Sequence, residues 1–219
     1  MSDHPQRSAL VQGLADLGLV LDAPQVDQLL GYLDWLGKWN RVYNLTAVRE
    51  PAAMVVQHLL DSLSAVRPLL AQHGGVVDGL RLLDVGSGGG LPGVVLAIAC
   101  PGLSVTCVDT VAKKALFVQQ VSAALRLPNL KGVHARVENL SGPYDVVCSR
   151  AFASLSDFVT WSTAALSPQG VWMAMKGKLP QAEMAALPPG VTVFHVEPLV
   201  VPGMDAERCI VWLRPSGVA

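Results

Sequence analysis

The stretch from Leu82 to Gly93 reads LLDVGSGGGLPG and contains the features that decide the fold. An apolar run ends near Asp84, a glycine-rich turn follows, and Pro92 opens a second apolar run that looks helical. Glycine lets the backbone adopt left-handed angles and leaves no side chain between the chain and a bound molecule. Proline suits a first helical turn because its missing N–H group removes no helical hydrogen bond. The stretch therefore predicts a strand, a ligand-binding loop and a helix. The glycines of that loop are Gly86, Gly88, Gly89 and Gly90.

A second predicted strand, residues 104–108, ends on an acidic residue, Asp109. In a βαβ unit a carboxylate about 20 residues past the glycines hydrogen-bonds ribose hydroxyl groups. Asp109 therefore indicates a nucleoside-like ligand. The alternative for Asp109 is a cap on the helix that follows it.

Asp84 bears on which nucleoside ligand the loop takes. The pattern G-x-G-x-x-G, typical of dinucleotide sites, does match from Gly88 to Gly93. Its first glycine should directly follow the strand, however, and a frame started at Gly86 has Leu91 where the third glycine belongs. A carboxylate at the mouth of the loop would repel a pyrophosphate but could accept a charge-assisted hydrogen bond from an amino group. S-adenosylmethionine has that amino group and no phosphate, so the sequence favours it. The alternative for Asp84 is a local cap on backbone N–H groups.

The composition is that of one large domain, or of one domain with an added subdomain. The chain has 219 residues, 51% of them hydrophobic, and a mean hydropathy of +0.41. No apolar run reaches the roughly 18 residues of a membrane span, and no signal peptide is evident. The four cysteines lie singly in apolar segments, which is typical of buried reduced thiols, so we expect a cytoplasmic protein. We also expect a monomer that does not bind membranes. The net charge of −1 gives no global basic field, so any contact with nucleic acid must be local.

We expect a helical N-terminal cap over residues 1–75. Helical spacing of apolar residues predicts helices over 8–19, from Pro24 onward, and over 51–70, with a polar loop over 40–48. His58 and Asp61 lie about one turn apart on the third of these helices. Their plainest interpretation is a paired histidine with a structural role.

Residues 76–219 read as an α/β domain. Strands and helices alternate with short connections, which is typical of a parallel sheet covered by helices. Val191–Val200 and Cys209–Arg214, on either side of a Pro-Gly turn, predict a hairpin at an antiparallel edge. The other predicted strands are 81–85, 104–108, 132–136, 144–149 and 170–175, and the helices are 91–100, 111–126 and 155–166.

The whole pattern resembles a class I S-adenosylmethionine-dependent methyltransferase, with a Rossmann-like, mostly parallel seven-stranded sheet and a C-terminal antiparallel hairpin. Six blocks, in order along the chain, resemble the glucose-inhibited division protein B family, which methylates N7 of one guanine, guanine 527, in bacterial 16S ribosomal RNA. The resemblance implies S-adenosyl-L-methionine as cofactor and the 16S RNA of the small ribosomal subunit as partner. The blocks are KWNRVYNLTAV (38–48), HLLDSL (58–63), DVGSGGGLPG (84–93), ARVENL (135–140), SRAFASL (149–155) and MKGKLP (175–180).

The resemblance also implies roles for residues of the glycine and ARVENL blocks. Gly86 and Leu91 would contact the cofactor, as part of the same loop as Gly88, and Asp109 would hold its ribose. The backbone of Val137 and the carboxylate of Glu138 would face the edge of the adenine.

Arg150 is the candidate catalytic residue, because the resemblance places it in the cofactor shell at the end of the fourth strand. Its guanidinium could hold the cofactor carboxylate, a phosphate of the target nucleotide or guanine O6, and the plain alternative is an ion pair with a loop carboxylate. Phe152 could stack on the target base or simply pack. The lysines expected to contact RNA phosphates are Lys113, Lys176 and Lys178.

The reaction implied for the chain needs no general base, because guanine N7 carries a lone pair and no proton. The sequence shows no nucleophile–histidine–acid constellation and no clustered metal ligands, so we expect no metal. Three other functions stay open: a methyltransferase acting on a small molecule, a nicotinamide-dependent oxidoreductase, and an RNA-binding module without catalysis.

Overall fold

The computed structural model of the chain describes residues 4–152 and 154–217. Seven strands form one sheet in the order β3-β2-β1-β4-β5-β7-β6, in which β1 to β5 run parallel and β7 is antiparallel to both β5 and β6. The predicted fold class, a mostly parallel sheet with a C-terminal antiparallel hairpin, is therefore confirmed. The strands are β1 (Arg81–Val85), β2 (Ser104–Asp109), β3 (Leu130–His134), β4 (Tyr144–Ser149), β5 (Leu166–Lys176), β6 (Val191–Leu199) and β7 (Arg208–Pro215).

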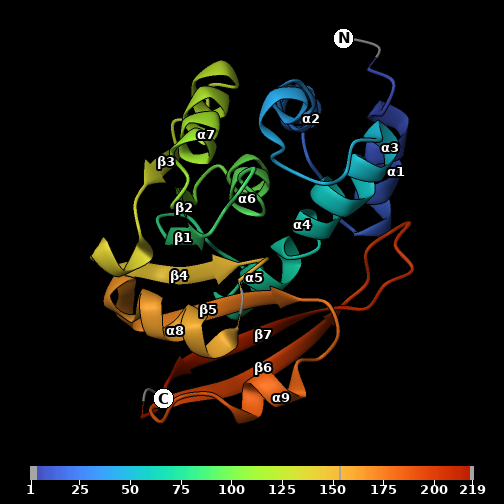
Figure 1. Cartoon of the computed structure of the whole chain (residues 1–219). Coiled ribbons are helices and arrows are strands. Elements are labelled where there is room, and N and C mark those ends of the chain that lie inside the picture. Colours follow the sequence, from blue (N-terminus) through green and yellow to red (C-terminus); the bar gives the residue numbers. More distant parts are fainter. Residues whose placement is uncertain (1–3, 153, 218–219) are drawn as a thin grey trace.

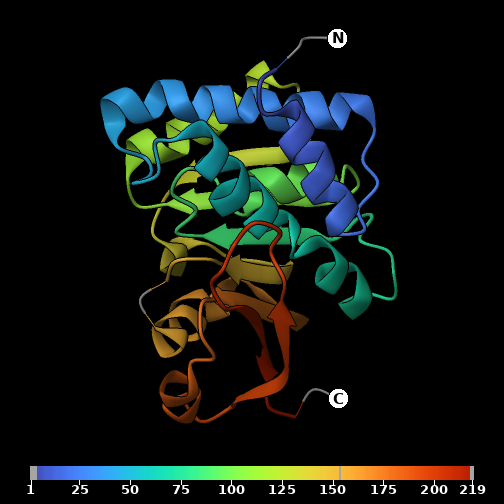
Figure 2. The same cartoon turned by 90° about the vertical axis from the view of Figure 1, so that its right-hand side faces the viewer.

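Helices cover both faces of the sheet, and each face has its own hydrophobic core. The N-terminal helices, α6 and α7 share the larger core, and α2 crosses over α6 and α7 (Figures 1 and 2). α8 belongs to the smaller core on the opposite face. The helices are α1 (Arg7–Asp16), α2 (Ala23–Tyr43), α3 (Pro51–Met54), η1 (Val55–Leu60), α4 (Asp61–Leu63), α5 (Val66–Gln72), α6 (Gly93–Ala99), α7 (Ala112–Ala124), η2 (Val137–Asn139), α8 (Leu155–Ser162), η3 (Thr163–Ala165) and α9 (Gln181–Ala185).

The C-terminal ends of the parallel strands meet at one edge of the sheet. There the last residue of β5, Lys176, pairs with Cys209 near the start of the antiparallel β7. Ligands of open α/β sheets bind at this edge, outside the carboxyl ends of the strands.

The N-terminal helices differ from the prediction in two places. The Asp22 side chain caps α2 in a reciprocal capping box with Gln25. The helix then continues to Tyr43, so the predicted loop over 40–48 begins only at Asn44, whose positive φ of 48° ends the helix. The single helix predicted over 51–70 is α3, a wide π-type turn η1, α4 and α5 in succession.

In the α/β part the elements are present but several bounds shift. β3 lies two residues before its predicted position. The helix predicted over 155–166 ends as α8 at Ser162 and is followed by the short η3. β5 therefore begins at Leu166, four residues earlier than predicted. α9 was not predicted. The division into a cap, 1–75, and a cofactor domain, 76–219, stays a prediction. In the part of the chain that the structure describes, no helix is long and apolar enough to cross a membrane.

Candidate active site

A cavity of about 450 Å³ lies at the C-terminal edge of the sheet. Residues that follow β1, β2 and β4 line it together with the short helix η2. Four of the residues predicted to bind cofactor are brought together here: Gly86, Asp109, Val137 and Glu138. Lys114, Arg136, Phe152 and Trp161 also contribute to its wall. We refer to it below as the cofactor cavity.

Gly86 is the first residue of the glycine loop and the point where the backbone reaches the cavity. Its φ of +66° is rarely adopted by residues with a Cβ atom, and its N–H group donates to the carbonyl oxygen of Val108 at 2.9 Å. A Cβ atom added there would meet only the Phe152 ring, at 3.8 Å. The loop therefore presents bare backbone to the cavity.

Asp109 holds the glycine loop as well as lining the cavity. One carboxylate oxygen accepts from the N–H group of Gly88 at 2.9 Å, and the other accepts from Val111 N–H at 2.8 Å, just before α7. The Lys114 ammonium lies 3.9 Å away. A carboxylate has about four acceptor positions, so these contacts leave room for ribose hydroxyl groups. The alternative, a cap on α7, is not what the structure shows: Val111 is the N-cap residue, α7 has no side-chain cap hydrogen bond, and Asp109 instead closes the turn that precedes the helix.

Asp84 does not lie at the mouth of the loop, and that expectation is wrong. Its side chain is fully buried on the side of β1 that α6 covers, where one oxygen accepts from the N–H group of Gly93, the first residue of that helix, at 2.8 Å. The other oxygen has no hydrogen-bond partner among the described residues. Burial raises the pKa of Asp84 to about 7. The alternative, a local cap on backbone N–H groups, describes what this residue does.

Two further predicted cofactor residues lie outside the wall of the cofactor cavity. The Leu91 side chain is packed in the larger core, and Gly88 contributes the N–H group that bonds Asp109.

Glu138 lies at the cavity with 39% of its side chain exposed and has Arg136 as an ion-pair partner at 3.8 Å. A flexible, partly exposed carboxylate of this kind is free to reorient toward a ligand.

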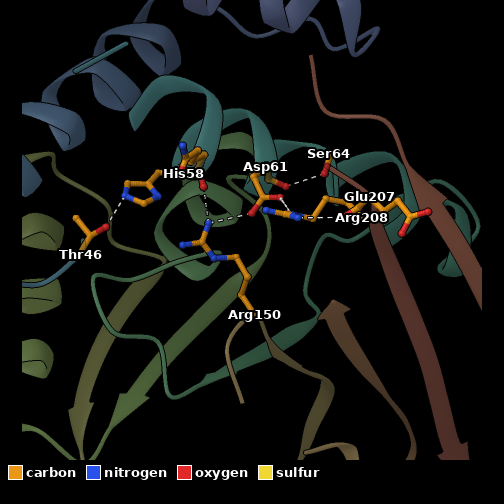
Figure 3. A network of polar contacts seen from close by, with 8 residues as sticks. Thr46, His58, Asp61, Ser64, Arg150, Glu207 and Arg208 are labelled. Carbon is orange, nitrogen blue, oxygen red and sulfur yellow. Dashed lines mark hydrogen bonds and ion pairs between the residues drawn. The ribbon is translucent and has the colours of Figure 1, made fainter. Parts of the chain in front are cut away.

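Arg150 points away from the cofactor cavity. Its Nη1 donates to the carbonyl oxygen of Gln57 at 2.9 Å and to Asp61 at 3.0 Å, and Arg208 donates to the other Asp61 oxygen at 2.9 Å (Figure 3). The ion pair considered as its plain alternative is therefore present, although the carboxylate belongs to a helix and not to a loop. These groups line a second cavity of about 320 Å³ at the same edge of the sheet, which we call the basic cavity.

The predicted RNA-binding lysines are spread along this edge. Lys176 lines the basic cavity and pairs with Glu183 at 2.8 Å, Lys113 lies 5.0 Å from the Tyr43 ring, and Lys178 is exposed. The Phe152 ring packs on Phe158 and Trp161 and also faces the cofactor cavity. Both interpretations of Phe152 therefore remain.

Sequence reasoning missed Lys114, Trp161 and Arg208. Lys114 follows Asp109 at a distance of one helical turn and a short loop, so its proximity could have been inferred from the predicted helix. Arg208 and Trp161 are isolated in their local sequence, and only the folded sheet brings them to the site. Among residues 4–152 and 154–217 no group of three or more His, Cys, Asp or Glu side chains is arranged to hold a metal ion.

Comparisons with known proteins identify the family of the chain. A sequence profile described as GidB, rRNA small subunit methyltransferase G, matches residues 25–211. The chain belongs to this family. It is 62% identical over 212 residues to the ribosomal RNA small subunit methyltransferase G of Polaromonas naphthalenivorans, covering 95% of this chain and 96% of that one. It is also 62% identical over 221 residues to the protein of the same name from Acidovorax ebreus, covering 98% of each.

Solved structures with little sequence similarity share the fold alone. TrmN from Thermus thermophilus superposes with a TM-score of 0.53 at 16% identity, covering 98% of this chain and 80% of that one. A SAM-dependent methyltransferase from Aquifex aeolicus superposes with a TM-score of 0.51 at 15% identity, covering 70% and 92%. The fold is therefore that of S-adenosylmethionine-dependent methyltransferases.

Proposed function

We propose that this protein transfers a methyl group from S-adenosylmethionine to N7 of one guanine, guanine 527, in the 16S RNA of the small ribosomal subunit. The observation that carries the proposal is the cofactor cavity. It combines the bare backbone of Gly86 with the carboxylates of Asp109 and Glu138 and with aromatic side chains. The chain that carries it belongs to the rRNA small subunit methyltransferase G family.

The residues around the cavity fit the parts of this cofactor. Asp109 retains acceptor capacity for ribose hydroxyl groups, and Glu138 can accept from the exocyclic amino group of the adenine while Val137 offers its backbone. Gly86 provides the close approach that the methionine part of the cofactor requires.

The chain's part in the chemistry is to align the two reactants. When bound, S-adenosylmethionine supplies a methyl group on a positively charged sulfur, and its transfer leaves the bond pair on sulfur and the positive charge on the guanine ring. N7 has no proton to lose, so no side chain has to act as a base. Holding two reactants in line contributes up to about 7–11 kcal/mol in principle. The ends of β1 and β2, which place Gly86 and Asp109, are suited to this task.

The direct test is methyl transfer in the test tube. The purified protein, tritium-labelled S-adenosylmethionine and small subunits from cells lacking the gene should give labelled N7-methylguanosine after digestion of the RNA. Subunits from wild-type cells, already methylated, should take up little label. Label in a different nucleoside, or transfer to free small molecules in place of RNA, would contradict the proposal.

A further inference from the structure

The basic cavity lies beside the cofactor cavity, and consecutive residues separate the two. Arg150 follows the last residue of β4 and turns into the basic cavity, whereas Ala151 and Phe152 line the cofactor cavity. The other wall of the basic cavity is the wide turn η1 of the N-terminal helices. A molecule that occupies the basic cavity is therefore a neighbour of whatever is bound at Gly86.

Cationic side chains outnumber anionic ones around this cavity. Arg150, Arg208 and Lys176 line it, each partly buried, with 21%, 29% and 15% of the side chain exposed. Asp61 bridges the two arginines, and Glu183 pairs with the lysine. Three positive charges against two negative charges leave one net positive charge. That balance suits a group with a single negative charge, such as a phosphodiester.

Hydrogen-bond donors remain unused in the same place. Asp61 engages Arg150 through Nη1 and Arg208 through Nε, so each guanidinium keeps an Nη2 group with no partner among the described residues. Asp61 is only 5% exposed and contacts both guanidinium groups, so it holds each of them in one orientation. Among the described residues Arg150 keeps Nε and Nη2 free, and these present the parallel N–H donors that match the oxygens of a phosphate, whereas Arg208 keeps the single Nη2 group. Asp61 is thus a positioning residue for the two arginines.

His58 supplies an independent sign that something is missing from the cavity. It is 4% exposed, its Nε2 bonds the Thr46 hydroxyl at 2.8 Å, and its Nδ1 is buried with no hydrogen bond of normal geometry among the described residues, although the Gln57 backbone lies close enough to raise the pKa of the ring. Figure 3 shows this second nitrogen on the side of the ring that faces Arg150. Burial lowers the pKa of His58, and the charge of Arg150 lowers it further, so the ring is neutral near pH 7. A buried nitrogen without a partner is costly, and a ligand group or a water held by a ligand would relieve that cost.

We propose that the basic cavity binds one phosphodiester group of the acceptor RNA, next to the nucleotide whose base is presented to the methyl group of the bound cofactor. This proposal rests on the proposed function, because it assumes an RNA acceptor. Arg150 and Arg208 donate to the phosphate oxygens, and Asp61 holds both donors in place. The cavity then fixes the backbone of the RNA, while the base is oriented separately toward the methyl group.

The test compares Arg208→Gln with a matched control, Arg214→Gln. Both residues belong to β7, but Arg214 lies toward the other end of that strand, against Phe194. Binding of unmethylated 16S RNA is measured at several salt concentrations, together with the affinity for S-adenosylmethionine. Loss of one phosphate contact should flatten the slope of log K against log salt by about 0.7–0.9 in Arg208→Gln. The control should keep the wild-type slope, and both variants should bind the cofactor within about twofold of wild type.

A second measurement needs no variant. In the wild-type protein with isotope-labelled histidine, the Nδ1 resonance of His58 should shift on titration with guanosine 5′-monophosphate and stay in place with guanosine. Inorganic phosphate should produce the same shift only at higher concentration, because a free phosphate lacks the neighbouring base. An equal response to inorganic phosphate and to the nucleotide would assign the cavity to free phosphate and overturn the proposal.

The outcomes separate the two proposals. If the wild-type protein methylates no RNA but the salt slope and the His58 shift behave as described, the proposed function fails and the phosphate site stands. If RNA is methylated but Arg208→Gln keeps the full salt slope, the phosphate site is wrong. A cofactor affinity that falls tenfold or more in Arg208→Gln with an unchanged salt slope would show that the cavity holds the cofactor carboxylate instead.

Discussion

Asp84 is a carboxyl group whose charge depends on its burial beneath the glycine loop. It receives one backbone hydrogen bond from Gly93 and has no exposed surface, and burial raises its pKa to about 7. In the unfolded chain the same group titrates near its ordinary value of 3.8. Between these two values the folded protein binds a proton that the unfolded chain has released. The free energy of unfolding contributed by Asp84 is therefore full below about pH 4 and falls as the pH rises through 7.

Replacing Asp84 by asparagine should remove this pH dependence. Relative to wild type, the free energy of unfolding of Asp84→Asn should rise by about 4 kcal/mol between pH 4 and pH 8, because the variant has no buried carboxyl group to ionise. Urea denaturation of both proteins at several pH values measures the difference. A difference that stays constant over that range would mean that Asp84 titrates normally in the folded protein.

Asp109 is the residue on which cofactor affinity should depend most. In Asp109→Ala the carboxylate that holds ribose hydroxyl groups is lost, which should weaken S-adenosylmethionine binding by about 1.5–3 kcal/mol, or roughly tenfold to a hundredfold. Calorimetric titration measures this affinity, and Asp205→Ala, which changes an exposed aspartate on the β6–β7 connection, is the control. An affinity within about twofold of wild type would reduce Asp109 to its contacts with Gly88 and Val111.

Site residues were predictable from the sequence where spacing within one βαβ unit decides their position. Gly86 comes directly after β1 and Asp109 is the last residue of β2. Because these strands are adjacent and parallel, both residues reach the cofactor cavity. The direction of Arg150 was not predictable, because its partners Gln57 and Asp61 lie 93 and 89 positions earlier in the chain. Nor was the burial of Asp84 evident, since its side chain lies beneath α6 and does not reach the cavity at the ends of the strands.

At the scale of elements, the junction between β1 and α6 depends on a close approach at Gly93. A Cβ atom at this position would overlap the Cys107 sulfur and lie 2.8 Å from the carboxylate oxygen of Asp84. Both neighbours are buried and cannot move away easily. A side chain at residue 93 would therefore force the buried Cys107 and Asp84 side chains to shift.

Gly93→Ala should destabilise the protein by about 1–3 kcal/mol, the usual cost of overpacking a core. Gly37→Ala is the matched control, because Gly37 lies inside α2 with no atom within 4 Å of an added Cβ. That substitution should stabilise the helix by about 0.5–1 kcal/mol. Chemical denaturation gives both values, and a Gly93→Ala protein as stable as wild type would refute the close packing at this junction.

The elements themselves were predictable to different degrees. Alternation of apolar strands and helices located β1, β2 and β4 almost to the residue, since each is a buried run bounded by turns. The wide turn η1 was not foreseen, because its sequence VVQHLL has ordinary helical spacing and its geometry accompanies tertiary contacts of Gln57, His58 and Asp61. Such turns are frequent at functional sites.

For the whole molecule, the topology brings two cavities of different chemistry to one edge of the sheet. The cofactor cavity follows β1, β2 and β4, and the basic cavity lies between β4, β5, β7 and the N-terminal helices. The net charge of the chain is −1, so recognition of RNA depends on cations gathered at this edge and not on the overall charge. The N-terminal helices thus contribute a wall of the proposed acceptor site as well as packing on the sheet.

The most direct measurement of the central claim is a map of N7-methylguanine in the 16S RNA of cells with and without the gene. Borohydride reduction followed by aniline cuts RNA at this modified base, so each modified position appears as a strand break. The account predicts one break that disappears when the gene is removed, returns with the wild-type gene and is reduced with Asp109→Ala. A break pattern that is the same with and without the gene would contradict it.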